Sequence, residues 1–551
     1  MKKILRHPLF WVLIISLLPL VSLLHAGLPV THDGVDHVAR IANFYQSLAE
    51  GNVIPRWAAN LNWGYGHPIL MFLYPLPSYM ASLFHFLGLS FVDSTKMVFG
   101  ITMIASGLSM YLWLQEAFGK RAGVIGALLY VFAPYRFVDL YVRGALGEHV
   151  AFVFPPLVLY FILKLSRSSG WRRIVQHGIG VVVSVAMLIL AHNAIAIMFM
   201  PIIGFYMVYL FLSESKQRWL FGILSISAVL TGFALSAFFW VPAFFEGKYT
   251  LRDIVTSGDV LARFVPWTWF IYSPWNYGQG DSLTKSLGIM QWAGIIASIA
   301  AIWKTKQVSV RVVLLSVLGI LFFSFFIMTS WSRPIWLAVT TLQKFQFPWR
   351  FLSVSAFAAA VIGGVTVGEL LKRVKAGPYI MAALCVLIVV ITVPMWQPKA
   401  YVTHDESFYS GIYLSTTDTG ESSPIWSVRF MEHTATAQLE VIDGDASITN
   451  GFRSATVHQY SVRVFKPTLF LENTVYFPDW KIYIDGALTQ IQFQNPNYRG
   501  LMTFQMAPGT HSVRAVFENT KVRTVAERIS LAALAIIGVM SFGVILWRKR
   551  T

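Results

Sequence analysis

The segment HDGVDHVARIANFYQSLAEG, which begins at His32, gathers two aspartates and two histidines in its first six residues. Asp33 has the side chain of a general base that takes a proton from a hydroxyl group, and His32, Asp36 and His37 are candidates to bind the substrate. Two alternatives stay open. These carboxylates and histidines also suit a divalent cation such as Mg²⁺ or Mn²⁺, and both aspartates stand where N-caps of the following amphipathic helix are expected.

Two further polar clusters lie in PYRFVDLYVRGALGEH and in LQKFQFPWRFL. Arg143 and Glu148 fall in one short loop, where a planar arginine fork binds phosphate and a nearby acid positions it or the acceptor. We place Glu148 with Asp33 among the catalytic candidates, and Arg143, His149 and Arg350 among the substrate-binding candidates. The structural alternatives are an ion pair between helix ends for Arg143 and Glu148, and snorkelling to lipid headgroups for Arg350.

The composition tells which kind of scaffold must position these residues. Hydrophobic residues make up 56% of the 551 residues and charged residues only 13%, whereas soluble domains average about 45–50% and about 25%. The net charge of +17 lies in short basic clusters between apolar runs, which is typical of cytoplasmic loops and argues against a nucleic-acid partner. The single cysteine, Cys385, excludes an internal disulfide and a thiolate zinc site.

A membrane-spanning helix needs about 20 mostly apolar residues. Runs of this kind predict a polytopic α-helical membrane protein with about 12 transmembrane helices. The expected spans are residues 9–24, 95–118, 123–140, 150–165, 174–191, 194–212, 220–240, 287–303, 310–328, 351–371, 379–396 and 529–547.

A further apolar stretch, residues 68–89, is predicted not to cross the membrane. Crossing would turn six later basic clusters outward, and its YPLP core breaks helix geometry because proline lacks the N–H group. We therefore expect a re-entrant or interfacial segment. The count places both termini in the cytoplasm, with the first apolar run as an uncleaved span in preference to a cleaved signal peptide.

The chain then divides into three parts. Residues 1–396 form the transmembrane domain, and its catalytic loops face outward at residues 26–94, 141–149, 241–286 and 330–350. Residues 397–527 turn polar and alternate in short β-type runs, which predicts an extracytoplasmic β-sandwich. Residues 528–551 supply the final transmembrane helix and a basic cytoplasmic tail.

Together these segments resemble the bacterial and archaeal membrane family called 6-pyruvoyl-tetrahydropterin synthase-related, a relative of the GT-C glycosyltransferases. The resemblance covers nearly the whole chain. It rests on HDGVDH with its following helix and PRW, on YPLP, APYRFVDLYVRGALGEH, LAHN and FQFPWRFL, and on YFPDWKIYIDG with APGTHSVRAVFE. It implies a GT-C-like fold with a catalytic first outer loop that uses a polyprenyl-phosphate sugar as donor.

The resemblance also implies roles for single residues. Asp33 falls where the base aspartate of GT-C enzymes is expected, and Arg143 and Glu148 fall on the other polar motif of the family. The spacing from Asp33 to Asp36 differs from the directly paired acids of many GT-C enzymes, so metal dependence stays open. No compact soluble domain with a histidine-cluster metal site supports the pterin chemistry of the family's label.

We therefore expect a glycosyltransferase in the cytoplasmic (inner) membrane. It would move a sugar from a lipid-linked donor to an acceptor outside the cytoplasm, such as an envelope glycan, a lipid or a protein. The alternative is a non-catalytic membrane scaffold or polysaccharide-assembly or binding protein. A transporter is disfavoured because acidic and histidine residues gather at the outward ends of the spans, and charged residues are nearly absent from the central turns of the spans.

Overall fold

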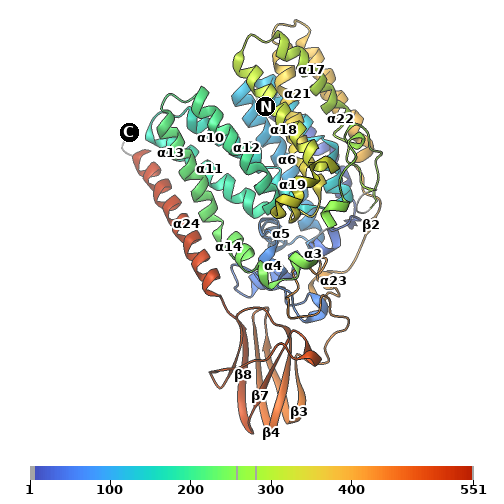
Figure 1. Cartoon of the computed structure of the whole chain (residues 1–551), viewed down its shortest axis with the longest axis vertical. Coiled ribbons are helices and arrows are strands. Elements are labelled where there is room, and N and C mark those ends of the chain that lie inside the picture. The colour runs from blue at the N-terminus through green and yellow to red at the C-terminus, as the bar shows by residue number, and fades with distance from the viewer. Residues whose placement is uncertain (1–6, 256–258, 279–281, 549–551) are drawn as a thin grey trace.

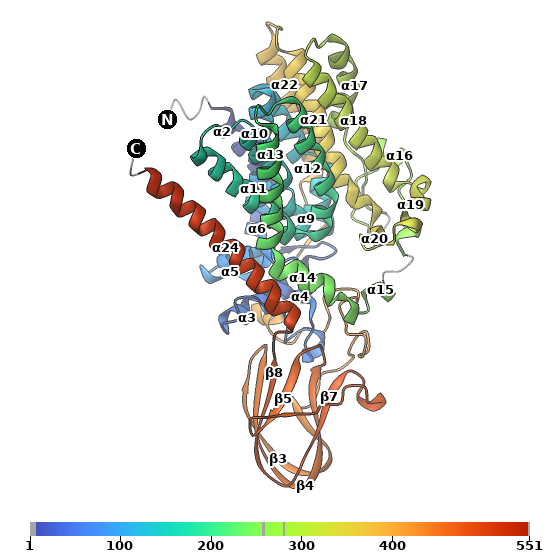
Figure 2. The ribbon, with the colours of Figure 1, turned by 60° about the vertical axis from the view of Figure 1, so that its left-hand side comes forward.

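The computed structural model describes residues 7–255, 259–278 and 282–548. Figure 1 shows a bundle of helices with a β-sheet domain at one end. We call that end of the bundle the sheet end and the opposite one the far end. The chain enters the sheet domain from the loops of the bundle and returns along the last helix, which leans away from the other helices in Figure 2.

The helices fall into long rods and short pieces. The longer helices are α3 (Gly34–Ala49), α6 (Phe91–Phe118), α7 (Lys120–Val131), α10 (Phe154–Ser166), α11 (Trp171–Ala191), α12 (Asn193–Ser213), α13 (Arg218–Leu235), α17 (Ile289–Lys304), α18 (Val308–Met328), α21 (Leu352–Leu370), α22 (Gly377–Thr392) and α24 (Lys521–Arg548). The others are α2 (Pro8–Leu17), α4 (Ile69–Phe72), α5 (Leu76–Phe86), α8 (Pro134–Phe137), α9 (Leu146–Ala151), α14 (Ala237–Phe245), α15 (Arg252–Val255), α16 (Thr268–Ile271), α19 (Arg333–Ala338), α20 (Thr340–Gln343) and α23 (Glu406–Ser410).

Each predicted span coincides with an apolar helical segment. Among the described residues, nine helices are long and apolar enough to cross a membrane, and the bent pair Lys120–Val131 and Pro134–Arg143 makes a tenth. Two shorter apolar segments, Pro8–Leu24 and Ile289–Lys304, cover the remaining predictions. The prediction of a polytopic helical membrane protein is therefore confirmed.

The proline-rich stretch is broken where the sequence indicated. α4 ends at Phe72, the chain turns at Leu73 to Pro75, and α5 begins at Leu76. Neither piece is long enough to span a membrane. α5 instead packs against α3 and α6, which keeps this segment beside the loops at the sheet end.

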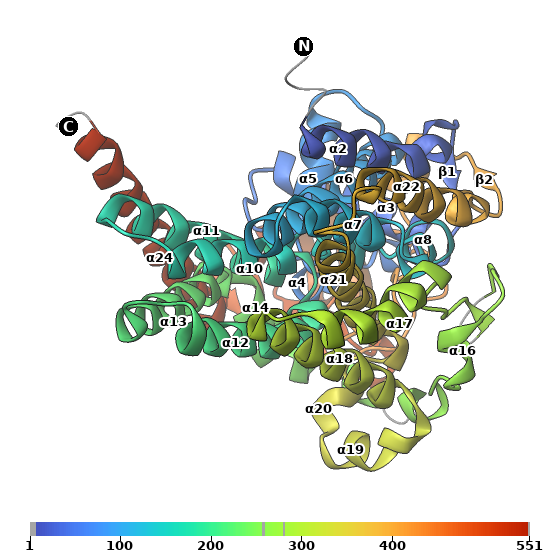
Figure 3. The same cartoon turned by 90° about the horizontal axis from the view of Figure 1, so that it is seen from above.

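The centre of the bundle is the pair α7 and α21, seen end-on in Figure 3. In the span of α21, 94% of the apolar stretch is buried, against 17% in α24. Small residues let the two central backbones approach. A Cβ added at Gly364 would lie 2.7 Å from the Ala122 carbonyl oxygen and 2.9 Å from the Gly126 Cα, so this contact requires glycine.

The sheet domain is antiparallel throughout. Its strands are β3 (Leu439–Arg453), β4 (Val457–Val475), β5 (Trp480–Ile484), β6 (Ala487–Thr489), β7 (Leu501–Met506) and β8 (Gly509–Phe517), in the order β3-β4-β8-β5-β6 with β7 also on β4. The long strand β4 pairs β8 through its first half and β7 through its second. The expected β domain is thus confirmed, and its strands are joined through β4 into one hydrogen-bonded sheet.

Aromatic packing attaches the sheet to the bundle. Trp57, from the loop after α3, lies 5.4 Å from Trp480 and 5.3 Å from Phe517, measured between ring centroids. Arg56 beside it forms an ion pair with Glu527 at the start of α24 at 2.6 Å. The sheet is therefore held against the first loop, which carries the aspartate cluster.

Candidate functional site

Asp33 precedes α3 at the sheet end of the bundle. Its N–H group donates to the Arg143 carbonyl oxygen at 2.9 Å, and the N–H of His32 donates to the Val142 carbonyl oxygen at 3.0 Å. The first loop is thereby fixed to the π-helical turn η3 (Val138–Arg143), an irregularity often found at functional sites.

The Asp33 side chain does not cap the helix. The Thr31 hydroxyl accepts from the Gly34 N–H at 3.1 Å and takes that place. Asp33 is partly exposed, and no described residue forms a hydrogen bond or ion pair with its carboxylate. The carboxylate therefore remains available to a ligand.

Arg143 and Glu148 form a buried ion pair. The Arg143 Nη2 lies 2.8 Å from Glu148 Oε1, and its Nη1 lies 2.9 Å from Glu148 Oε2. The same Nη1 also contacts Asp139 at 2.8 Å and the Tyr135 hydroxyl at 3.0 Å. A buried ion pair is stable only when its geometry is good and further hydrogen bonds satisfy its polar atoms. Here Glu148 Oε2 also accepts from the Tyr135 hydroxyl at 2.8 Å.

Arg350 joins this network from the turn η8 (Pro348–Phe351), before α21. Its Nε donates to Glu148 Oε1 at 2.8 Å and its Nη1 to the Phe345 carbonyl oxygen at 2.8 Å. Its side chain is 15% exposed, so it turns inward to Glu148 rather than snorkelling outward. Among the described residues, its Nη2 has no hydrogen-bond partner.

Asp36 and His37 lie one helical turn inside α3. Burial raises the pKa of the Asp36 carboxyl, whose Oδ1 accepts from the Tyr413 hydroxyl at 2.9 Å. Burial and the charge of Arg40 hold the pKa of His37 well below its ordinary value, so this imidazole is neutral at pH 7. His37 therefore contributes a hydrogen-bonding ring rather than a positive charge.

The two remaining predicted residues, His32 and His149, differ in their exposure. His32 is partly exposed, and its Nε2 lies 3.4 Å from the Tyr277 carbonyl oxygen in the loop after α16. His149 is fully buried and meets the Phe99 ring edge-on at 5.2 Å. The structure thus brings together Asp33, the Arg143–Glu148 pair and Arg350, whereas His149 packs into the helical core.

A segment far along the chain closes the site, and we call residues 406–427 the strap. Tyr413 binds Asp36, and the Thr417 hydroxyl accepts from Arg40 Nε at 2.8 Å. Gln346 donates to Glu421, which ties the strap to the loop before α21. Helix α3 and the loop before α21 are therefore joined by a single segment that leads into the sheet.

Asp418 is the buried acid of the strap. Its Oδ1 lies 3.6 Å from His67 Nε2, and the N–H groups of Gly420 and Ser422 donate to its two oxygens at 2.9 and 3.0 Å. Burial acts to raise the pKa of Asp418, but His67 and Ser422 outweigh it and the net shift is downward. This carboxylate is therefore ionised at pH 7.

Tyr74, from the break between α4 and α5, covers the site. Burial raises the pKa of its hydroxyl to about 12, and the charges of Arg40, Arg350, Glu148 and Asp33 all act on it. Its ring lies where a Cβ on Gly147 would be, 1.9 Å from the nearest ring atom, and 4.6 Å from the ring of His192. The YPLP, GALGEH and LAHN motifs thus meet around one tyrosine.

The sequence analysis missed several of these residues. Asp139 and Tyr135 belong to the motif that contains Arg143, and an acid at the end of a span was a signal for them. Arg40 lies one turn beyond Asp36 on the same helix, which the helical period also indicates. Within residues 7–255, 259–278 and 282–548, no group of three or more His, Cys, Asp or Glu side chains could hold a metal ion.

Fold and site together define a multi-pass helical membrane protein with a polar site at the sheet end of its bundle. The chain belongs to the family described as 6-pyruvoyl-tetrahydropterin synthase related, a family of membrane proteins, whose model matches residues 70–402. The resemblance stated from the sequence is therefore confirmed. The matched region includes Arg143, Glu148 and Arg350 and begins after Asp33.

Similar proteins include an uncharacterized protein of Lactococcus lactis subsp. cremoris. It is 23% identical over 240 residues, which cover 42% of this chain and 38% of that protein. The chain therefore spans little more than a third of the length of this relative.

Solved structures that are similar to this chain include three at 12–15% sequence identity. The arabinofuranosyltransferase AftD from Mycobacteria has a TM-score of 0.46 at 14% identity, over 71% of this chain and 27% of that one. The oligosaccharyltransferase of Archaeoglobus fulgidus has a TM-score of 0.43 at 15% identity, over 77% and 59%. ArnT from Cupriavidus metallidurans, solved with undecaprenyl phosphate, has a TM-score of 0.30 at 12% identity, over 65% and 76%.

Proposed function

We propose that this protein transfers a sugar from a polyprenyl-phosphate donor to an acceptor hydroxyl on the non-cytoplasmic side of the inner membrane. The observation that carries the proposal is the Asp33 carboxylate. It has no hydrogen-bond or ion-pair partner among the described residues, while the backbone beside it is fixed to the turn η3 at Arg143. A general base requires a carboxylate that is held in place by its backbone and is not bound by another side chain.

In this proposal Asp33 takes the proton of the acceptor hydroxyl. The acceptor oxygen attacks the anomeric carbon of the donor, and the bond from that carbon to the phosphate oxygen breaks. The polyprenyl phosphate leaves with the electron pair, and attack in line with the leaving group inverts the anomeric centre. The acceptor is an envelope glycan, a lipid or a protein.

Arginines near Asp33 would bind the donor phosphate. The Nη2 atoms of Arg350 and Arg40 form no hydrogen bond with the described residues. Both guanidinium groups lie close enough to Tyr74 to lower the pKa of its hydroxyl. Arginine nitrogens of this kind bind phosphate oxygens strongly. Arg143 is already engaged by Glu148, Asp139 and Tyr135, so it positions Glu148, and Glu148 in turn positions Arg350.

The strap would border the acceptor side of the site. It reaches α3 through Tyr413 and Thr417 and the loop before α21 through Glu421. The sheet beyond it would bind the acceptor or steady the loops. A divalent cation, if one takes part, would have to be shared between Asp33 or Asp36 and the phosphate of the donor.

Mass spectrometry of the cell envelope tests the proposal. A strain that lacks the protein should lose one glycan modification and accumulate its lipid-linked sugar. The wild-type gene should restore both, Asp33→Asn should not, and Asp405→Asn, an exposed aspartate of the same linker as the strap, should behave as wild type. Full restoration by Asp33→Asn would favour a non-catalytic scaffold or assembly protein.

A further inference from the structure

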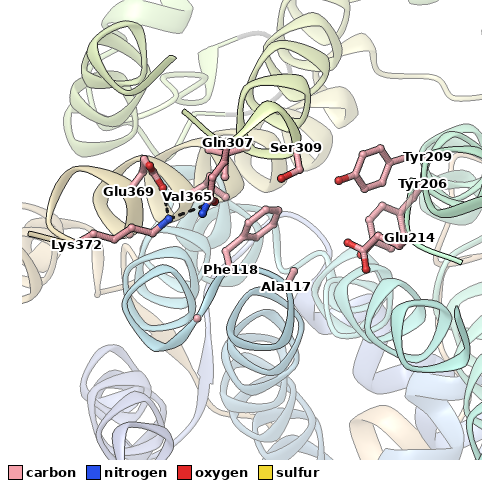
Figure 4. A pocket seen from close by; sticks show the side chains of 13 residues that line it. Ala117, Phe118, Tyr206, Tyr209, Glu214, Gln307, Ser309, Val365, Glu369 and Lys372 are labelled. Carbon is pink, nitrogen blue, oxygen red and sulfur yellow. Dashed lines mark hydrogen bonds and ion pairs between the residues drawn. The ribbon is translucent and has the colours of Figure 1, made fainter. Parts of the chain in front are cut away.

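A second polar region lies at the far end of the bundle, away from the site at the sheet end. A cavity of about 320 Å³ opens there between the ends of α6, α12, α18 and α21. Figure 4 shows the polar side chains that face it. They are Tyr206, Tyr209, Glu214, Gln307, Ser309, Glu369 and Lys372. A cavity of this size holds a small ligand or a lipid headgroup.

The charged groups of this cavity are already paired. Glu214 accepts from Arg167 at 2.8 Å, and Lys372 binds Glu369 and the Gln307 side-chain oxygen. The acids of the lining are thus neutralised by bases. Neither carboxylate of the lining is therefore left without a basic partner.

Hydrogen-bond donors remain at the same place. The Ser309 hydroxyl and the side-chain nitrogen of Gln307 form no hydrogen bond with the described residues. The Tyr209 hydroxyl accepts from the Ser213 side chain, and the Tyr206 hydroxyl accepts from Trp113 at 3.1 Å, so neither tyrosine donates its own proton to a described residue. Four neutral donors with an ammonium group beside them form a suitable environment for phosphate oxygens.

Exposed apolar faces continue from the cavity along two helices. Phe205, Val208 and Leu212 are 55–68% exposed on α12, at the spacing of one helical face. Val308, Val312 and Leu315 are exposed in the same way on α18. These faces lie next to the cavity-lining residues of their own helices, so the polar cavity is continuous with lipid-facing surface. A ligand that uses both must be amphipathic.

We propose that this cavity binds the phosphodiester headgroup of a membrane glycerophospholipid, with its acyl chains along α12 and α18. The phosphate would accept from Tyr209, Ser309 and Gln307, with the Lys372 ammonium group nearby. The Tyr209 and Ser309 hydroxyls would both contribute to the affinity, because neither donates its proton to a described residue. This binding site is separate from the proposed transfer reaction and does not depend on it.

Native mass spectrometry of the purified full chain tests the proposal. The protein is delipidated in detergent and titrated with a phosphatidylglycerol, with the matching diacylglycerol, or with millimolar inorganic phosphate as competitor. Wild type should retain one phosphatidylglycerol and no diacylglycerol, and inorganic phosphate should not displace it. The double variant Tyr209→Phe/Ser309→Ala loses two hydrogen bonds to the phosphate, which should raise the apparent Kd for phosphatidylglycerol at least about tenfold.

A matched control removes the same groups elsewhere. Tyr379 is 81% exposed on α22 and Ser227 is exposed on α13, so Tyr379→Phe/Ser227→Ala should bind the lipid as wild type does. Ser309→Trp, which fills the cavity, should abolish retention of phosphatidylglycerol. This second variant tests the site independently if the double variant Tyr209→Phe/Ser309→Ala fails to fold. Equal binding by wild type and both cavity variants, equal binding of the diacylglycerol, or displacement by inorganic phosphate would each overturn the proposal.

Discussion

The N–H group of Asp33 donates to the carbonyl oxygen of Arg143 across 2.9 Å, although the two residues belong to different loops. This bond sets the candidate base beside the turn that holds the Arg143–Glu148 pair. Neither side chain takes part in it. The position of Asp33 therefore depends on backbone geometry, and substitution of its side chain leaves the loop in place.

Glu148 is the residue on which the buried network depends. Glu148→Gln removes the charge that Arg143 and Arg350 both contact, and breaking a buried pair in this way costs about 3–5 kcal/mol. We expect a clear drop in the temperature at which half of the protein is unfolded. Tryptophan fluorescence of the protein in detergent measures this midpoint. Glu116→Gln is the control, because Glu116 is 30% exposed and pairs with Lys164, and exposed pairs contribute about 0–1 kcal/mol. Similar midpoints for both variants would contradict a structural role for the network.

Arg350 should be sensitive to the shape of its side chain as well as its charge. Lysine carries its donors on a single nitrogen, which cannot reach the separate positions from which Arg350 Nε binds Glu148, Nη1 binds the Phe345 carbonyl oxygen and Nη2 would bind phosphate. Arg350→Lys should therefore raise the KM for a polyprenyl-phosphate sugar about tenfold, which corresponds to about 1.4 kcal/mol. Arg373→Lys, at an exposed position of the far end, should leave KM unchanged, and an unchanged KM in Arg350→Lys would remove Arg350 from the donor site.

Asp418 gives the strap a pH dependence of known sign. The pKa of Asp418 in the folded protein lies below its ordinary value of 3.8. The ionised carboxylate therefore stabilises the fold at pH values above 3.8, and this stabilisation is lost as the pH falls from 3.8 towards the folded-state pKa. Asp418→Asn should unfold at a lower temperature than wild type at pH 7, and the difference should shrink as the pH falls from about 5 to below 4. Asp405→Asn should follow the wild-type curve. A constant difference across this range would show that the charge of Asp418 is not what stabilises the strap.

Close packing of the two central helices can be tested at a single glycine. Gly364→Ala places a methyl group against the backbone of α7, and overpacking of this kind costs about 1–3 kcal/mol. A Cβ at Gly319 in α18 meets no atom within 4 Å, so Gly319→Ala should be neutral or stabilising because alanine favours helix. Thermal unfolding of the two variants compares them directly. Equal stability would mean that α7 and α21 do not require this contact.

The spans were predictable because the signals for them are local. Hydropathy and the basic clusters placed each helical segment, and two prolines marked the break at Tyr74. The pairing of Arg143 with Glu148 was also foreseen as an alternative, since five residues in one loop bring them together. These features follow from short sequence distances.

The missed features depend on contacts between distant residues. Whether Asp33 or Thr31 caps α3 is decided by the direction of one hydroxyl group, which helix-capping rules alone do not settle. Tyr413 reaches Asp36 across 377 residues of sequence, and no periodicity in the strap indicates that contact. The sequence left substrate binding and snorkelling to lipid headgroups as alternatives for Arg350. Only the fold shows that its side chain turns inward to Glu148.

The most direct test of the proposed activity measures release of polyprenyl phosphate by the purified full chain in liposomes, with a polyprenyl-phosphate sugar and an envelope acceptor. Removing a general base typically costs about 10²- to 10⁴-fold in rate, so Asp33→Asn should lose at least about 100-fold while its unfolding midpoint and its donor binding stay those of wild type. Asp405→Asn should release polyprenyl phosphate at the wild-type rate. Release by folded Asp33→Asn at the wild-type rate would contradict the assignment of Asp33 as the base.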